Sequence, residues 1–405
     1  MKRHLPLEGI RVADFTWVWA GPFCTLQLAH LGAQVIRIET ASRPCVTRMI
    51  PPWADGQFGV NRSGYFNQYN QGKLSLALDL KHPRAVGIAK ELIAKSDIVC
   101  ENFSAGVMDR LGLGYSVLQA VKSDIIMIAM SGYGATGPER EFVSYGPAQV
   151  PLSGMSSLTG YAGRPPMHVG ISYGDPTAGL HGAFAVLAAL LHRSRTGKGQ
   201  FIDLSQQETT IAVLPEGMME YTMNGTQPAR NGNSDPDMAP HGVFRCAGEQ
   251  RWVSIVVRSD AEWARFAQVI GRPELATEER YQTLAARKAN EEELEEVVTG
   301  WTRSHSPDEV TRTLQGAGIP AFTSLSSKDI AEDRHLNDAG FFARMNHPEV
   351  GVRQHIGIPW RMTATPCDVQ QPAPCLGEQT DYVMAELLNY PADEISRLKQ
   401  DGVLK

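Results

Sequence analysis

The sequence of 405 residues lacks the features of several protein classes. It has no excess of basic residues, because 38 Lys and Arg face 44 Asp and Glu, for a formal net charge of −6. Nucleic-acid binding depends on neutralising phosphates, so this balance argues against it. No stretch approaches the roughly 18 apolar residues of a membrane span, and the N-terminus shows no apolar signal-peptide region. We predict a cytoplasmic protein with no nucleic-acid or membrane partner.

The chain also lacks the motifs of common metal and cofactor sites. Its six cysteines show no pairing such as CxxC, and most of them lie among apolar neighbours, as reduced core thiols do. The first predicted turn has no GxGxxG sequence, which a dinucleotide-binding fold needs to approach a pyrophosphate, although Glu39 lies about where a ribose-binding acid would. We therefore expect no metal site, and a nicotinamide or flavin cofactor is disfavoured.

What the chain does contain is a regular alternation of strand and helix patterns. The run from Ile125 to Met130 is nearly all apolar, which is typical of a parallel strand covered by helices on both faces. Further strands are predicted at 10–15, 35–38, 74–80 and 97–100, and helices at 22–31, 83–93 and 206–223. This pattern predicts an α/β fold with a large doubly wound parallel sheet.

The composition changes at residues 224–240, which are rich in Asn, Asp, Pro and Gly. Beyond this loop the pattern is that of a smaller α+β unit, with strands at 252–257 and 319–325 and helices near 260–270, 290–303 and 307–316. We predict a large domain over 1–223 and a small α+β domain over 224–330. Residues 331–405, with a final helix at 380–388, are expected to return and complete the large domain.

The stretch from Gly170 to Gln200 combines a loop, one carboxylate and a long helix. Four large apolar residues recur at helical spacing and predict the buried face of this helix: Leu180, Phe184, Leu187 and Leu191. Gly179 and Gly182 leave its first turns without bulk, as if another group approached the backbone closely. The sequence does not say which group that is.

Asp175, directly before Pro176, opens this helix and has two interpretations. Asp at the N-cap followed by Pro is a common helix start. The free N–H groups and the positive end of the helix dipole would also favour an ionised carboxylate that is placed to react. The local pattern leaves both interpretations open.

Several stretches in one order resemble a known family. They are LEGIRVADFTWVWAGPFCTLQLAHLGAQVIRIE, LSLALDLKHP, SDIVCENFSAGVMDRLGLGY, GDPTAGLHG with HRSRTGKGQFIDLS, GIPAFTSLSS and APCLGEQTDYVMAELL. Together they resemble the class III CoA-transferases, a superfamily that includes formyl-CoA transferase, carnitine CoA-transferase and the α-methylacyl-CoA racemases. The resemblance covers nearly the whole chain.

The resemblance implies that Asp175 is a nucleophile that attacks an acyl-CoA thioester. An Asp with the ordinary pKa of about 3.9 is ionised at pH 7 and needs no general base. The positions that match CoA-contacting residues are Leu78, Lys81, Asn102, Phe103, Ser104 and Arg110, while Trp19 and Ala20 match the junction of thioester and acyl group. Without the family, Lys81 and Arg110 would be interpreted as surface charges and Phe103 as a core residue.

The resemblance also implies partners and an assembly. The substrates would be an acyl-CoA and a carboxylic acid acceptor, with the CoA thioester as substrate and no permanently bound cofactor. The resemblance implies an interlocked dimer, in which two chains are threaded through each other. A homodimer or a heterodimer with a related subunit is therefore expected. A non-catalytic CoA-binding subunit of such a hetero-oligomer is one alternative function.

Departures from the family pattern bear on the reaction and the substrate. Tyr145 is a further predicted site residue, whose phenol can donate a hydrogen bond to a thioester or carboxylate oxygen. At this position the racemase branch would need a histidine base, and a phenol is a poor base at pH 7, so CoA transfer is favoured over the alternative of racemisation. Thr40 stands where relatives often have an arginine, which shifts the expected nucleotide-phosphate contact to Arg43 or Arg48. If Arg43, Arg48 and Arg62 line the pocket among the nearby aromatic residues, they suit an acid with a second carboxylate, as for a benzylsuccinate CoA-transferase subunit.

Overall fold

The computed structural model describes residues 4–405 and divides the chain into two compact units. The first contains the chain up to Ser156, His168–Gln227 and Asp338–Lys405. The second contains Ser157–Met167 and Pro228–Asn337, so the chain enters it twice. No pattern in the sequence predicts that the short segment Ser157–Met167 belongs to the second unit.

Six parallel strands form the central sheet of the first unit. Their spatial order is β3, β2, β1, β4, β5, β6. Their bounds are Arg11–Asp14 (β1), Gln34–Glu39 (β2), Leu74–Ala77 (β3), Ile98–Glu101 (β4), Ile126–Ser131 (β5) and Phe201–Ser205 (β6). The predicted α/β fold with a parallel sheet is confirmed. The order reverses between β1 and β4, and in such sheets this reversal creates a crevice at the carboxyl ends of the strands.

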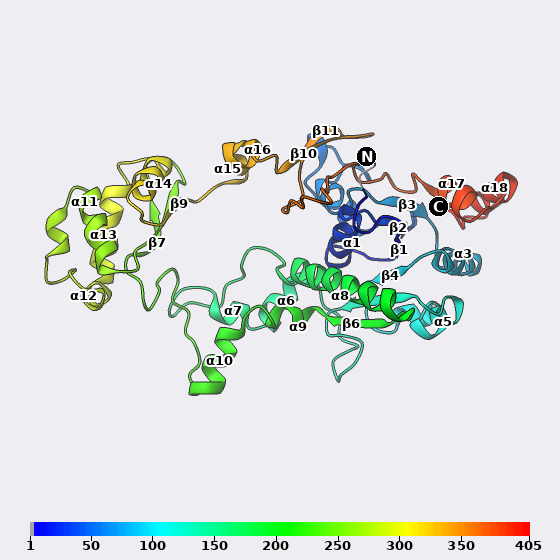
Figure 1. The fold of residues 1–405 in the computed structure, drawn as a ribbon, viewed down its shortest axis with the longest axis horizontal. Coiled ribbons are helices and arrows are strands. Elements are labelled where there is room, and N and C mark those ends of the chain that lie inside the picture. The colour runs from blue at the N-terminus through cyan, green and yellow to red at the C-terminus, as the bar shows by residue number, and fades with distance from the viewer. Residues whose placement is uncertain (1–3) are drawn as a thin grey trace. The chain divides into compact units, whose positions relative to one another are not determined.

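Helices cover both faces of this sheet, because its strand residues are apolar on both sides. Val12, Val35 and Ile126 pack against α1 (Ala20–His30) and α8 (Gly174–Thr196). The next residue along each of these strands, Ala13, Ile36 and Met127, faces the opposite side of the sheet. That side packs against α3 (Pro83–Ala94), α5 (Tyr115–Val121) and residues 383–404. Figure 1 shows α8 as the long helix lying alongside β6. The C-terminal residues thus belong to the core of the first unit.

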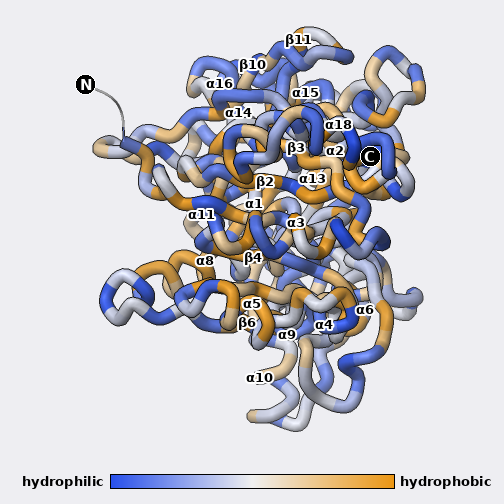
Figure 2. The backbone as a smooth tube through the Cα atoms, turned by 90° about the vertical axis from the view of Figure 1, so that its right-hand side faces the viewer, coloured by the Kyte–Doolittle hydropathy of each residue, from blue (hydrophilic) through white to orange (hydrophobic). Residues whose placement is uncertain are grey.

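Helix α8 forms as predicted, but of the four residues predicted for its buried face only Leu187 packs against the core. Phe184 is 74% exposed, and Leu180 and Leu191 are also exposed. The buried face consists of small residues and one carboxylate: Gly174, Asp175, Thr177, Ala178, Gly179, Gly182, Ala183, Val186 and Ala189. Small side chains let α8 approach its neighbours closely, whereas Leu180, Phe184 and Leu191 stay uncovered in one chain. Figure 2 shows the hydropathy of the residues along the backbone.

The remaining helices of the first unit include two departures from the predictions. The helix predicted at 206–223 is interrupted before Pro215, since proline cannot continue a helix, and forms α9 (Gln206–Ile211) and α10 (Pro215–Asn224). The helix predicted at 380–388 is a short α17 (Thr380–Tyr382) followed by a π-helical turn (Val383–Leu387), and the last helix is α18 (Ala392–Gln400). The other bounds are α2 (Gly64–Tyr69), α4 (Val107–Arg110), α6 (Gly146–Leu152) and α7 (Met155–Leu158).

The first unit also contains a hairpin, and the second unit has its own core. The hairpin strands are β10 (Phe342–His347) and β11 (Gly351–Ile356). In the second unit an antiparallel sheet of β7 (His241–Arg245), β8 (Trp252–Val256) and β9 (Ala321–Thr323) packs around Trp263 and Phe266. Its helices are α11 (Asp260–Val269), α12 (Leu284–Ala289), α13 (Glu291–Thr302), α14 (Pro307–Gly316), α15 (Ser327–Glu332) and α16 (Arg334–Asp338). Among residues 4–405, none of the helices combines the length and the apolar character that a bilayer crossing needs.

Candidate functional site

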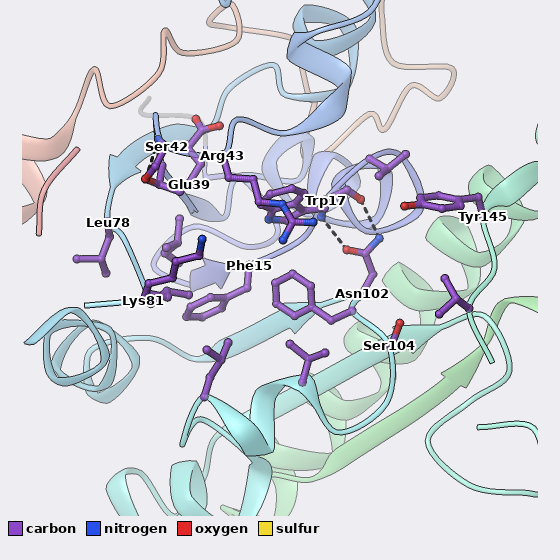
Figure 3. Close-up of a pocket in the computed structure, with 18 of the residues that line it drawn as sticks. Phe15, Trp17, Glu39, Ser42, Arg43, Leu78, Lys81, Asn102, Ser104 and Tyr145 are labelled. Atoms are coloured by element: carbon purple, nitrogen blue, oxygen red, sulfur yellow. Dashed lines mark hydrogen bonds between the residues drawn. The ribbon is translucent and has the colours of Figure 1, made fainter. Parts of the chain in front are cut away.

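A cavity of about 450 Å³ opens at the carboxyl ends of the central strands in the first unit. Segments that follow β1, β2, β3 and β4 form most of its wall, and residues 143–146 and Asp175 form the remainder. The cavity therefore lies where the strand order reverses, which is the usual ligand position in an open parallel sheet. Figure 3 shows the residues of the wall.

Seven of the ten predicted site residues line this cavity: Leu78, Lys81, Asn102, Phe103, Ser104, Tyr145 and Asp175. The other three, Trp19, Ala20 and Arg110, do not line it. Arg110 lies exposed at the end of α4, as its surface-charge interpretation requires. Trp19 and Ala20 directly follow the lining residues Trp17 and Val18, and the backbone N–H of Ala20 donates to Asp175.

Asp175 lies in the first turn of α8 but does not cap the helix. The N-cap residue is Tyr173, and no side chain caps this end, so the N-cap interpretation of Asp175 is wrong. The carboxyl group is 6% exposed and accepts a hydrogen bond from the backbone N–H of Ala20. Burial raises the pKa of Asp175 to about 7, and the Ala20 hydrogen bond offsets part of that rise. The expectation of an ordinary, fully ionised Asp at pH 7 is therefore corrected.

Gly146, the first residue of α6, lies directly against the carboxyl group of Asp175. A Cβ atom at this position would lie 1.6 Å from Oδ2 of Asp175, so only glycine fits without displacing the carboxyl group. Tyr145 precedes it as the N-cap residue of α6, and its hydroxyl group points into the cavity (Figure 3). The start of α6 therefore holds the Asp175 carboxyl group from one side and places the Tyr145 hydroxyl group at the same cavity.

Helix α1 holds Asp175 from the other side. A Cβ atom at Gly179 would lie 2.8 Å from the carbonyl oxygen of Ala20 and 3.1 Å from the backbone nitrogen of Cys24. The group that approaches the backbone near Gly179 is therefore helix α1. This close packing brings the Ala20 N–H to Asp175.

Aromatic residues surround the same carboxyl group. Trp19 packs against Tyr65 and Tyr69 of α2, with ring centroids 5.8 and 5.2 Å away. Burial raises the pKa of Tyr69 to about 12, and the charge of Asp175 adds to this rise. The pKa of Tyr65 is raised by burial, Tyr69 and Asp175. Both phenols are therefore neutral near pH 7 and are available as hydrogen-bond donors near Asp175.

Asn102 follows β4 and forms two hydrogen bonds with the backbone of Trp17. Its Oδ1 accepts from the Trp17 N–H at 2.7 Å, and its Nδ2 donates to the Trp17 carbonyl at 2.8 Å. Figure 3 shows both hydrogen bonds at the cavity wall. The side chain that was predicted to contact CoA thus first holds the loop after β1.

Two cations, Arg43 and Lys81, also line the cavity, together with Ser42 and Asp79. The Arg43 guanidinium lies over the ring of Trp17, 5.1 Å from its centroid, and Lys81 follows β3. Within residues 4–405 neither side chain has an ion-pair partner, so both are available to an anionic ligand. Arg48 is not available, because it is buried and bonded to Glu39 at 2.7 Å. Arg62 is paired with Asp55 at 3.0 Å.

A buried ion pair that the sequence analysis missed fixes the start of α1. Lys73 Nζ lies 3.4 Å from Asp14 Oδ2 and donates to the Pro22 carbonyl at 2.9 Å and to Thr25 Oγ1 at 2.8 Å. Burial lowers the pKa of Lys73 to about 8, although Asp14 opposes this shift. The only signal in the sequence is a polar Asp14 at the carboxyl end of an apolar strand.

Comparisons with known proteins agree along almost the whole chain. The model of CoA-transferase family III matches residues 7–380. A succinyl-CoA–D-citramalate CoA-transferase from Chloroflexus aurantiacus is 31% identical over 399 residues, covering 98% of both chains. A succinyl-CoA:glutarate CoA-transferase from Mus musculus is 32% identical, covering 99% of this chain and 90% of the relative. The crystal structure of a CAIB/BAIF family protein from Brucella suis has a TM-score of 0.87 at 29% identity, covering 95% of this chain and all of the other.

Proposed function

Because the chain belongs to CoA-transferase family III and is an enzyme that transfers CoA, we propose that Asp175 is the nucleophile of that transfer. The observation that carries the proposal is a buried carboxyl group at the cavity wall, held by the Ala20 N–H and by Gly146. A pKa of about 7 keeps a substantial fraction ionised near neutral pH while making that anion more nucleophilic than an exposed one.

The reaction then proceeds in four balanced steps. The Asp175 carboxylate attacks the thioester carbonyl of the donor, and CoA leaves as a thiolate to give a mixed anhydride. The thiolate attacks the Asp175 carbonyl carbon and releases the donor acid, which leaves an enzyme thioester. The acceptor carboxylate attacks this thioester and releases CoA thiolate again. The thiolate finally attacks the acyl carbon of the new anhydride, which frees Asp175 and the new acyl-CoA.

Each tetrahedral intermediate puts negative charge on an oxygen beside Asp175. Tyr145 lies at the cavity with its hydroxyl group pointing inward, so it can donate a hydrogen bond to that oxygen or to an acid substrate. It is a phenol and not a basic imidazole, which supports transfer and not abstraction of a proton from an α-carbon. We assign Tyr145 a donor role on this basis.

We place the CoA nucleotide at the end of the cavity with free cations. Arg43 and Lys81 would bind its phosphates, and the apolar wall near Leu78 and Phe103 would contact the neighbouring part of CoA. Arg48 has no part in this, since its guanidinium is bonded to Glu39. Asp175 would then meet the thioester at the opposite end.

We propose succinyl-CoA as the donor and a second dicarboxylic acid as the acceptor, since relatives that use succinyl-CoA match along the full chain. Of the three arginines predicted to hold a second carboxylate, Arg48 and Arg62 are already paired, whereas Arg43 lines the cavity without an ion-pair partner within residues 4–405.

The test is to incubate the protein with succinyl-CoA and a panel of acids, including citramalate, glutarate, malate, oxalate and benzylsuccinate, and to separate the CoA esters by chromatography. At least one new acyl-CoA should form, with an equal amount of succinate released. Hydrolysis of succinyl-CoA without transfer to any acid would contradict the proposed function.

We propose that a second copy of the chain covers the exposed apolar row on α8, as an interlocked dimer would. Phe184, Leu180 and Leu191 are exposed there, and Met218, Tyr221 and Met223 are exposed on α10. Apolar rows of this extent are uncommon on the surface of a monomer. Some relatives are alpha and beta subunits of one transferase, so the second copy could also be a related chain in the cell.

Replacing Phe184 with aspartate should weaken this dimer, because a charge would be buried without a partner. Light scattering after size-exclusion chromatography should give twice the chain mass for the wild type and a concentration-dependent lower mass for the variant. Phe322→Asp, at an exposed phenylalanine of the second unit, serves as the matched control and should stay dimeric. A monomeric wild type, or a Phe184→Asp variant as dimeric as the control, would contradict the proposed interface.

A further inference from the structure

The backbone at Val18 adopts a conformation that valine rarely takes. Its φ is 63°, in the left-handed region. Within residues 4–405, three other non-glycine residues have positive φ, namely Asp55, Gln250 and Asn389, and none of them is β-branched. A β-branched residue in this region is strained, and such strain persists only where the surroundings enforce it.

Two side chains from different segments enforce it here. Asn102 bonds both the N–H and the carbonyl of Trp17, the residue before Val18. The Val18 N–H itself donates to Sγ of Cys45, at 3.3 Å. The backbone of Trp17 and Val18 is thus held from β4 on one side and from the segment after β2 on the other.

This turn determines where helix α1 begins. Trp19 is the N-cap residue of α1, and Ala20, two residues after Val18, donates its N–H to Asp175. The start of α1 also packs directly on Asn102, because a Cβ atom at Gly21 would lie 3.0 Å from Cγ of Asn102. A change at Asn102 is therefore transmitted over a few residues to the hydrogen bond on Asp175.

We propose that Asn102 is a positioning residue: by holding Trp17 it keeps Val18 in the left-handed conformation and so aims the Ala20 N–H at the Asp175 carboxyl group. The inference rests on the proposed role of Asp175 as nucleophile. It differs from the role that the family resemblance gave to Asn102, which was direct contact with CoA. Its Oδ1 and one N–H of its Nδ2 are already bonded to Trp17.

Asn102→Ala should lower kcat about 10- to 100-fold with little change in KM for the acyl-CoA. The acid limb of the pH profile of kcat/KM should also move to higher pH, because loss of the Ala20 N–H destabilises the Asp175 anion. Tyr65 and Tyr69, the other titratable groups that interact with Asp175, stay neutral in this range. Asn346→Ala, at an exposed asparagine on β10, is the control and should leave kinetics unchanged.

Val18→Gly, added to Asn102→Ala, should recover up to about 10-fold of the lost kcat, because glycine adopts positive φ without the strain of valine. A contact between Asn102 and CoA could not be restored in this way. A raised KM or dissociation constant for the acyl-CoA with an unchanged kcat and no recovery by glycine would overturn the proposal and leave the role of Asp175 intact.

Cys45 offers a second test should Asn102→Ala not fold. Cys45→Ser retains an acceptor for the Val18 N–H and should keep the wild-type pH profile, whereas Cys45→Ala should move the acid limb upward as Asn102→Ala does. Equal profiles for the two cysteine variants would overturn the proposal. An active Asp175→Asn variant would instead remove the proposed function on which it rests, so the two failures are distinguishable.

Discussion

Asp175→Asn should abolish CoA transfer and at the same time stabilise the folded protein. Asparagine keeps the shape of the side chain and can still accept the Ala20 N–H, but its amide oxygen does not form an anhydride with an acyl group. Loss of a covalent nucleophile typically removes most of the rate enhancement, so we expect turnover to fall by at least about 10⁴-fold. Chromatography of the CoA esters measures this loss.

The gain in stability follows from the raised pKa of Asp175. Because burial raises its pKa in the folded state to about 7, above the unfolded value of about 3.9, the folded protein binds an extra proton between these values. The free energy of unfolding therefore decreases as pH rises from about 4 to about 7. An asparagine avoids this loss, so the variant should gain up to about 4 kcal/mol at pH 8, and the gain should vanish near pH 4.

Asp329→Asn is the control with the opposite sign. Hydrogen bonds from Ser326, with help from Arg251, lower the pKa of Asp329 to about 2, so its replacement should not stabilise the protein at any pH and should leave turnover intact. Thermal melts at pH 4 and pH 8 compare the variants. An Asp175→Asn protein that turns over normally, or that melts below the wild type at pH 8, would count against the assigned site.

Gly146→Ala should reduce kcat/KM by about 100-fold while leaving a folded protein. The new methyl group would lie 1.6 Å from Oδ2 of Asp175, so the carboxyl group must move away from the Ala20 N–H. A displacement of about 1 Å at a reacting group is enough to cost this much. The φ of Gly146 is not positive, so the effect arises from the contact and not from backbone strain. Steady-state kinetics at pH 8 measures it.

Gly87→Ala is the matched control in the same unit. Gly87 lies inside α3, and a Cβ atom there would meet nothing within 4 Å. This variant should keep full activity and gain about 0.5–1 kcal/mol, the usual benefit of alanine over glycine in a helix. Full activity of Gly146→Ala would mean that the Asp175 carboxyl group can react from another position, and the geometry of the site would then be wrong.

The sheet could be predicted from the sequence because its signals are local. The apolar run in β5 and the short strands that alternate with helices mark buried parallel strands wherever they occur. The buried face of α8 could not be predicted from the sequence. A helical spacing of large apolar residues is interpreted as the face that packs on the core, and small residues are not considered. Here Gly179 and Ala183 face the core, and Phe184 and Leu191 stay exposed on a single chain.

The site was predictable as a set of residues but not in its chemistry. The resemblance brought Asp175, Lys81 and Tyr145 together, and all three line one cavity. The raised pKa of Asp175 depends on burial among groups more than 25 residues away in the chain, Gly146 and Ala20, which no local pattern relates to it. The role of Asn102 likewise appears only when its hydrogen bonds to Trp17 are seen.

The central claim is that an acyl group and then CoA are carried on the side chain of Asp175. The most direct test is to mix the protein with succinyl-CoA without an acceptor, add hydroxylamine, and digest the protein for mass spectrometry. Hydroxylamine converts both proposed intermediates to a hydroxamate on the enzyme or on the released acyl group. We predict a hydroxamate on Asp175 that requires succinyl-CoA and is absent from Asp175→Asn. A hydroxamate on another carboxylate, with the Asp175 peptide unmodified in the presence of succinyl-CoA, would contradict the account.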